Sequence, residues 1–163
     1  MNSGAMIRTT FSGMALLIMA GCSPAPVDAI SVKQQVQRHA REIVASYNAH
    51  DAARTASFDA PDYIGMFHGT PNVQGPAADE AGMKIQMQDS AAAWTQGKDR
   101  ITVSRDGTIA IYEAPYTFTF TEAESKKLIK DTGNWIAIFK RQPDGSMKLW
   151  RSIGTDAPVQ SNK

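Results

Sequence analysis

The sequence predicts an α+β fold in which N-terminal helices pack on one face of a mainly antiparallel sheet. Apolar residues recur three or four positions apart between Val32 and Tyr47, which is the spacing of one helical face. From Arg100 onward the pattern is that of strands, and turn sequences at 105–107 and 143–145 divide them into hairpins. Helices that precede antiparallel strands are typical of this class.

Residues 1–21 resemble a bacterial lipoprotein signal peptide. Arg8 precedes a short apolar run, residues 11–20, which leads through Gly21 to Cys22, the single cysteine of the chain. The run is about half the ~20 residues that span a bilayer, so we expect cleavage before Cys22. The resemblance implies that two or three acyl chains, palmitate among them, anchor Cys22 to the membrane. An ordinary secretory signal with a chance cysteine is the alternative.

The residues after Cys22 bear on the location of the chain. In Gram-negative lipoproteins an aspartate after the acylated cysteine tends to retain the protein at the inner membrane, and here this residue is Ser23. The resemblance therefore implies a cell-envelope protein on the periplasmic face of the outer membrane. Residues 22–30 then form the lipidated cysteine and a Pro-rich tether, 31–157 the domain, and 158–163 a flexible tail.

Composition limits the possible partners. Arg8 is the only charged residue before Cys22, so the chain from Cys22 onward carries 16 basic and 16 acidic side chains. We expect no nucleic acid partner, because no basic stripe is present. His39, His50 and His68 show no metal-binding spacing, and the chain has no phosphate-binding loop or nucleophile elbow. We therefore expect neither a metal nor another cofactor.

The first elements are two helices. Ser31 and Gln34 fit a capping box, so we expect the first helix to begin at Ser31 and to bury the apolar face that ends at Tyr47. Asp51 is the expected N-cap of a second, short helix that ends near Phe58.

The segment after the second helix is mixed. Residues 59–62, Asp-Ala-Pro-Asp, have turn chemistry, and residues 63–68 predict a short strand. A loop with two prolines over 69–76 leads to a third helix over 77–88. Residues 90–95 fit either a helix end or a strand.

The remaining sequence predicts two hairpins. Residues 100–104 should pair with 108–121, and residues 133–140 with 147–154. Pro115 lies inside the longest of these strands, so we expect a bulge or kink there. The polar segment between the two hairpins is expected to leave the sheet.

Several local strings, in this order, resemble the nuclear-transport-factor-2-like superfamily, which includes SnoaL-like and ketosteroid-isomerase-like proteins. They are Tyr-Asn-Ala-His-Asp at 47–51, the segments 58–63 and 106–110, and two stretches near the end, 133–140 and 143–149. The last three are similar to the branch known as domain-of-unknown-function family 4440. The resemblance spans nearly the whole of the predicted domain.

This resemblance implies a strongly curved sheet wrapped round a helix, a cystatin-like cone with a pocket open at one end, and a tendency to form homodimers. Ketosteroid isomerase moves a proton with a carboxylate and stabilises the enolate with a tyrosine and a neutral carboxylic acid. The family's helix tyrosine falls here on Ile43, and its strand base falls on Met66 or Phe67. None of these side chains can do that chemistry, so we do not expect steroid isomerisation.

Two residues are the remaining acid–base candidates. His68 ends the strand that runs along the pocket in this family, and imidazole titrates near neutral pH. Glu113 has the strand parity of Ile109 and Ile111, which would point its carboxylate at an apolar face and raise its pKa. For His68 the alternative is a surface residue, and for Glu113 a side chain turned to solvent by Pro115.

Aromatic residues are dense in the predicted strands and, with His68, form the candidate ligand-binding set. Such residues can line an apolar pocket with hydroxyl handles, or they can pack a core or a dimer interface. The set is Tyr63, His68, Tyr112, Tyr116, Phe118, Trp135 and Trp150.

Three functions fit the sequence. The first is an envelope lipoprotein whose cone binds a small, largely apolar molecule without converting it. The second is a protein-interaction or dimerisation module that uses the open face of the sheet. The third is an isomerase- or dehydratase-like enzyme that uses His68 or Glu113.

Overall fold

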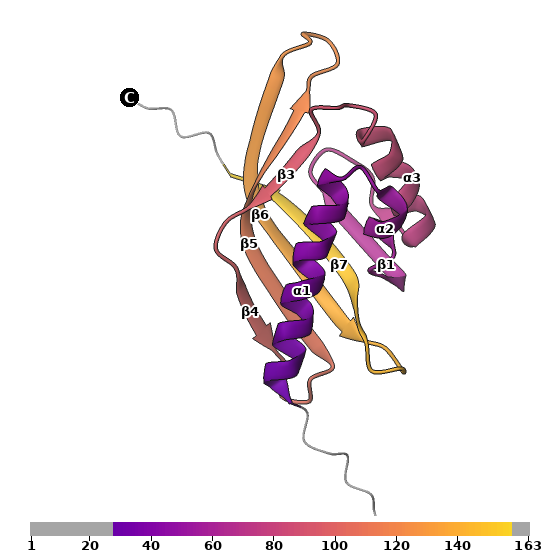
Figure 1. Ribbon diagram of the computed structural model, residues 1–163, viewed down its shortest axis with the longest axis vertical. Helices are drawn as coiled ribbons and strands as arrows, with labels where there is room; N and C mark the ends of the chain where they lie inside the picture. Colours follow the sequence, from indigo (N-terminus) through magenta and orange to yellow (C-terminus); the bar gives the residue numbers. More distant parts are fainter. Residues whose placement is uncertain (1–27, 158–163) are drawn as a thin grey trace, which may run out of the picture.

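The computed structural model describes residues 28–157 (Figure 1). The predicted signal peptide, Cys22 and the tail 158–163 lie outside the described residues. None of the helices in this part of the chain combines the length and the apolar composition that crossing a bilayer requires.

Three helices precede or interrupt the first strands. They are α1 (Ala29–Asn48), α2 (Ala52–Ala56) and α3 (Pro76–Gln86). The apolar spacing predicted for the first helix is confirmed, since Val32, Val36, Ala40, Ile43 and Tyr47 are all buried.

Within residues 28–157, seven strands form one curled sheet. They are β1 (Asp59–Phe67), β2 (Val73–Gln74), β3 (Ala93–Gln96), β4 (Arg100–Val103), β5 (Ile109–Thr121), β6 (Leu128–Arg141) and β7 (Met147–Asp156). The strand order is β2-β1-β7-β6-β5-β3, with β4 paired to β5 beside β3. All pairs are antiparallel except β1 with β7. The predicted α+β class, with N-terminal helices packed on a curved sheet, is confirmed.

Helix α1 lies along the concave face of this sheet, and α2, α3 and β1 lie at one side of it (Figure 1). One core cluster joins buried residues of α1 to Tyr112, Trp135 and Phe139 on β5 and β6. A second cluster joins Tyr47 to Met83 and Met87 at the end of the third helix. Members of both clusters line a cavity between the helices and the sheet.

Two boundaries predicted from the local sequence differ from the structure: the start of the first helix and the start of the first strand. Helix α1 begins at Ala29, because the side chain of Asp28 accepts the backbone N–H of Ile30; the predicted start at Ser31 is wrong. The predicted turn over 59–62 is also wrong, since β1 already begins at Asp59. Asp51 does cap the second helix, as predicted, by accepting the N–H of Arg54.

Pro115 does not interrupt the ladder between β5 and β6, whose register runs unbroken from Ile109 to Thr121. Instead, Pro115 stands where β5 changes partner on its other edge. Strand β4 pairs up to Glu113, and β3 pairs from Tyr116. A proline without an N–H fits this gap, because no neighbouring strand requires a donor there.

Candidate functional site

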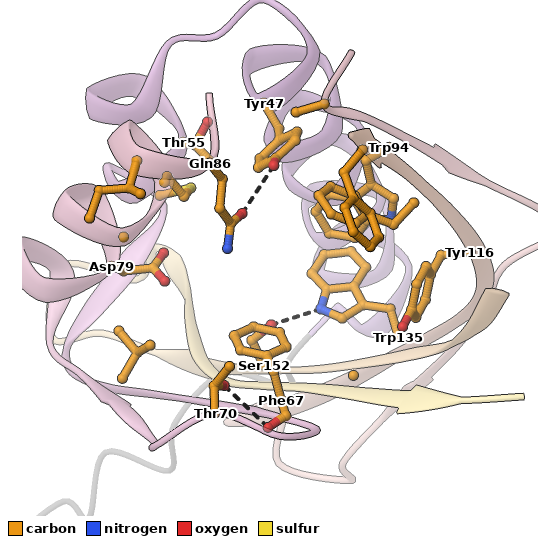
Figure 2. A pocket seen from close by; sticks show the side chains of 18 of the residues that line it. Tyr47, Thr55, Phe67, Thr70, Asp79, Gln86, Trp94, Tyr116, Trp135 and Ser152 are labelled. Carbon is orange, nitrogen blue, oxygen red and sulfur yellow. Dashed lines mark hydrogen bonds between the residues drawn. The ribbon is translucent and has the colours of Figure 1, made fainter. Parts of the chain in front are cut away.

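A cavity of about 860 Å³ lies between the three helices and the concave face of the sheet. Its lining residues come from α1, α2, α3 and from strands β1, β2, β3, β5, β6 and β7. Figure 2 shows side chains from opposite walls facing one open space. A volume of this size suits a small organic ligand.

One wall of the cavity is aromatic. Trp94 packs edge-on against Trp135, with ring centroids 4.7 Å apart, and against Tyr47 at 6.0 Å. Phe118 packs edge-on against Tyr47 as well. Tyr116 completes this wall beside Trp135 (Figure 2). These edge-to-face contacts fix the rings, so their apolar faces are held ready for a ligand.

The opposite wall carries two carboxyl groups, Asp59 from the start of β1 and Asp79 from the first turn of α3. Asp59 is 6% exposed, and its Oδ2 finds no hydrogen-bond donor within residues 28–157. The Tyr63 hydroxyl donates to Asp79 Oδ1 over 3.3 Å. Figure 2 shows the carboxyl of Asp79 directed into the open space.

Burial controls the protonation of this pair. Removal from water and the negative charge of Asp79 together raise the pKa of Asp59 to about 9. Burial also raises the pKa of Asp79, although Tyr63 and Asp59 both stabilise its ionised form. At neutral pH Asp59 therefore holds a proton.

A polar chain connects the aromatic wall to the carboxyls. Trp135 Nε1 donates to Ser152 Oγ over 2.9 Å, and the Ser152 hydroxyl interacts in turn with the oxygen of Tyr63. Burial raises the pKa of Tyr63, so it remains a neutral donor towards Asp79. Gly65 leaves room for this arrangement, because a Cβ there would lie 2.7 Å from the Tyr63 hydroxyl.

Two further polar side chains of the cavity are Gln86 on α3 and His68, which directly follows β1. Tyr47 donates its hydroxyl to Gln86 Oε1 over 3.0 Å, and the amide nitrogen of Gln86 faces the open space in Figure 2. Nδ1 of His68 lies 3.9 Å from an Asp156 oxygen, and the His68 side chain is 80% exposed. His68 thus stands at the solvent side of the cavity.

Five of the seven predicted ligand-binding residues line this cavity: Tyr63, His68, Tyr116, Phe118 and Trp135. Tyr112 does not; it is buried in the core and donates to Gln96 Oε1 over 2.8 Å. Trp150 does not either, because its indole donates to the exposed Asp62 and packs against Arg151 on the opposite face of the sheet.

The geometry expected for Glu113 is wrong. The core-facing residues of β5 near it are Tyr112 and Ala114, so the half-exposed Ile111 and Glu113 share the outer face. There Glu113 forms a bidentate pair with Arg100, with both hydrogen bonds at 2.9 Å. This position follows from the strand parity, not from the kink at Pro115 that was the alternative.

Sequence reasoning missed both aspartates of the cavity. Asp59 was assigned to a turn, although it pairs with Leu149 at the start of the parallel ladder. Asp79 was assigned no role within the third helix. A helical signal for it does exist, because Asp79, Met83 and Gln86 recur four and three residues apart and share the face that lines the cavity.

Comparison with solved structures identifies the fold. An NTF2-like protein with a cystatin-like fold from Novosphingobium aromaticivorans superposes with a TM-score of 0.65 at 16% identity, covering 81% of this chain and 86% of that one. An NTF2-like superfamily protein from Salmonella enterica gives 0.67 at 14%, covering 82% and 96%. The hexachlorocyclohexane dehydrochlorinase LinA-type3 from Novosphingobium barchaimii gives 0.69 at 14%, covering 78% and 87%.

The chain has the nuclear-transport-factor-2-like fold. No protein-family model matches the sequence, and no curated protein matches it. Function on a given fold depends on the residues of its site. In this nuclear-transport-factor-2-like cone, a protonated Asp59 can donate a hydrogen bond, an ionised Asp79 can accept a proton or attract a cation, and Tyr63 can donate.

Proposed function

We propose that this chain is a cell-envelope lipoprotein whose cone binds a small, largely apolar molecule without converting it. The observation that carries the binding function is the cavity of about 860 Å³ with an aromatic wall and a few polar groups opposite. Pockets of this size and make-up are typical of small-molecule sites. The finer assignment to the family 4440 branch and the homodimer stay predictions.

Binding can be tested with the neutral fluorescent probe N-phenyl-1-naphthylamine. We expect a saturable rise in fluorescence at about one probe per chain, because the probe leaves water for the aromatic wall. Gly82→Trp should abolish this rise. Gly82 lines the cavity from α3, and a Cβ there meets nothing within 4 Å, so the indole has room to occupy the space.

The matched control is Ala81→Trp, which adds the same indole to the neighbouring, exposed helix position outside the cavity lining. This variant should bind the probe as the unaltered chain does. Probe binding that is equal in Gly82→Trp and Ala81→Trp would place the probe outside the cavity and contradict the proposal.

The lipoprotein part of the proposal rests on Cys22 and the residues before it. Each acyl chain contributes about 0.8 kcal/mol per buried methylene, so two or three chains hold a protein firmly on a membrane. We therefore expect Cys22→Ala to move the protein from the membrane fraction to the soluble fraction of the envelope. Fractionation followed by immunoblotting measures this change, and unchanged retention in the outer membrane would refute the anchor.

Acid–base catalysis is a second candidate function, favoured by the contact of Tyr63 with Asp79 inside the cavity. A raised pKa brings a carboxylate base closer to neutral pH, where proton abstraction is most effective. The catalytic group would then be Asp79 rather than His68 or Glu113. Chemical change of a bound molecule that disappears in Asp79→Asn would favour this candidate over simple binding.

A further inference from the structure

The ionisable groups that line the cavity are almost all acidic. Apart from His68 and three tyrosines they are aspartates, and neither Lys nor Arg lines the cavity within residues 28–157. The aspartates come from β1, α3, the loop that follows α3, β6 and β7, so they surround the space from several sides: Asp59, Asp79, Asp89, Asp131 and Asp156. A concave site lined by one sign of charge concentrates ligands of the opposite sign.

The two buried carboxyls of the cavity, Asp59 and Asp79, have no cationic partner among the described residues. The cation that acts on Asp59 is Lys148, whose Nζ donates to the backbone oxygen of Ser57 and which is absent from the cavity lining. A carboxyl pair that holds one proton keeps one negative charge, and a buried charge without a partner is costly.

The wall opposite the pair suits a cation as well. The rings of Trp94, Trp135 and Tyr116 face the same space as Asp79 in Figure 2. The faces of Trp and Tyr rings attract cations, and they also bury apolar surface. A ligand that ends in an ammonium group can therefore satisfy both walls of the cavity together.

We propose that the cavity selects a monocationic amine with an apolar body, and that its ammonium group is bound by Asp59, Asp79 and Tyr63. This inference rests on the proposed binding function and names its ligand class. The ammonium group donates to Asp79 and to the Oδ2 of Asp59 that has no donor. The apolar body lies against the aromatic wall. A carboxylate or phosphate is excluded, because it would enter a site lined by aspartates.

Matched amines and alcohols test the inference by isothermal titration calorimetry on the purified full chain. Dehydroabietylamine and dehydroabietinol share one three-ring skeleton, and 2-phenylethylamine and 2-phenylethanol share a smaller one. We expect at least one amine to bind about 10- to 100-fold more tightly than its alcohol, as a hydrogen bond to a buried charge contributes. Asp79→Asn should remove this preference and leave the affinity for the alcohol unchanged.

Asp144→Asn is the matched control, since Asp144 lies in the exposed turn between β6 and β7, outside the cavity lining. It should keep the preference for the amine. Asp79→Ser provides a second cavity variant without the carboxylate should Asp79→Asn fail to fold, which circular dichroism detects.

The outcomes separate the two proposals. Alcohols that bind as tightly as amines overturn the inference on the amine and leave the proposed binding function intact. A preference that persists in both cavity variants also overturns it. If neither skeleton binds, the inference fails, and the proposed function fails with it only when the naphthylamine probe does not bind either.

Discussion

Asp59→Asn is expected to stabilise the protein at pH 8 and to flatten the pH dependence of its free energy of unfolding. Burial raises the pKa of Asp59 to about 9, whereas the unfolded chain ionises this carboxyl near 3.8. Between these pH values the folded state holds a proton that the unfolded state has lost. An asparagine has no proton to lose, so the variant avoids this difference.

The sign follows from which state binds the proton. The stability that protonated Asp59 contributes is complete below pH 3.8 and is lost as the pH rises towards 9. One proton gives a slope of at most about 1.4 kcal/mol per pH unit, so the unaltered chain should lose up to about 4 kcal/mol between pH 5 and pH 8. Urea unfolding at several pH values measures this loss.

Asp62 on the same strand is the matched control, because its pKa is shifted in the opposite direction. Its exposed carboxyl accepts hydrogen bonds from Lys140, which lower its pKa. Asp62→Asn should therefore leave the loss of stability between pH 5 and pH 8 unchanged. A stability curve of the unaltered chain that is flat over this range would show that the buried pair does not retain its proton.

Gly133→Ala is expected to destabilise the protein by about 3 kcal/mol, which lowers the melting temperature by roughly 10 °C. A Cβ on Gly133 would lie 1.9 Å from the backbone oxygen of Thr155 and 2.9 Å from the ring of Tyr116. The backbone of β7 must then move away from β6, where Gly133 pairs with Asp156. Differential scanning calorimetry measures the effect.

Gly82→Ala provides the comparison for this substitution. It adds the same methyl group to a glycine inside α3, where a Cβ has open space, and alanine is the better helix former by about 1 kcal/mol. The melting temperature should rise slightly. Equal melting temperatures for the two alanine variants would contradict the close approach of the two strands at Gly133.

Elements with one buried face could be predicted from the sequence. Residues from Val32 to Tyr47 show a helical period because only one side of α1 enters the core. The pattern instead predicts a polar excursion for the beginning of β6, from Leu128 to Asp131. It pairs with β5 and is largely exposed, so no apolar alternation marks it as a strand.

The local sequence pattern does not show which face of the sheet a side chain of the site occupies. Ile109 and Ile111 are apolar on the outer face of β5, so composition did not show which face carries Glu113. Trp150 occupies the position in β7 where the register shifts: Ile138 pairs with Arg151 and Phe139 with Leu149. Trp150 is thus an extra residue in β7, as in a β-bulge. A bulge turns the side chains beyond it to the other face, and the sequence does not mark its position.

The aspartate pair was missed for a related reason. The string Asp-Ala-Pro-Asp at 59–62 has strong turn chemistry, yet it lies in a strand whose partner, β7, comes about ninety residues later. Tertiary contact thus overrides the local preference. Once the carboxyls of Asp59 and Asp79 are brought together by folding, their burial creates an electrostatic environment that neither residue has in the sequence.

The parallel pairing of β1 with β7 also bears on the order in which the chain folds. The strand with Asp59 and Tyr63 can join the sheet only after the last strand exists, so a nascent chain has an unfinished cone. Closing so long a loop is slow compared with forming a hairpin. We therefore expect the two hairpins to assemble early and the hollow between helices and sheet to close in the final kinetic step.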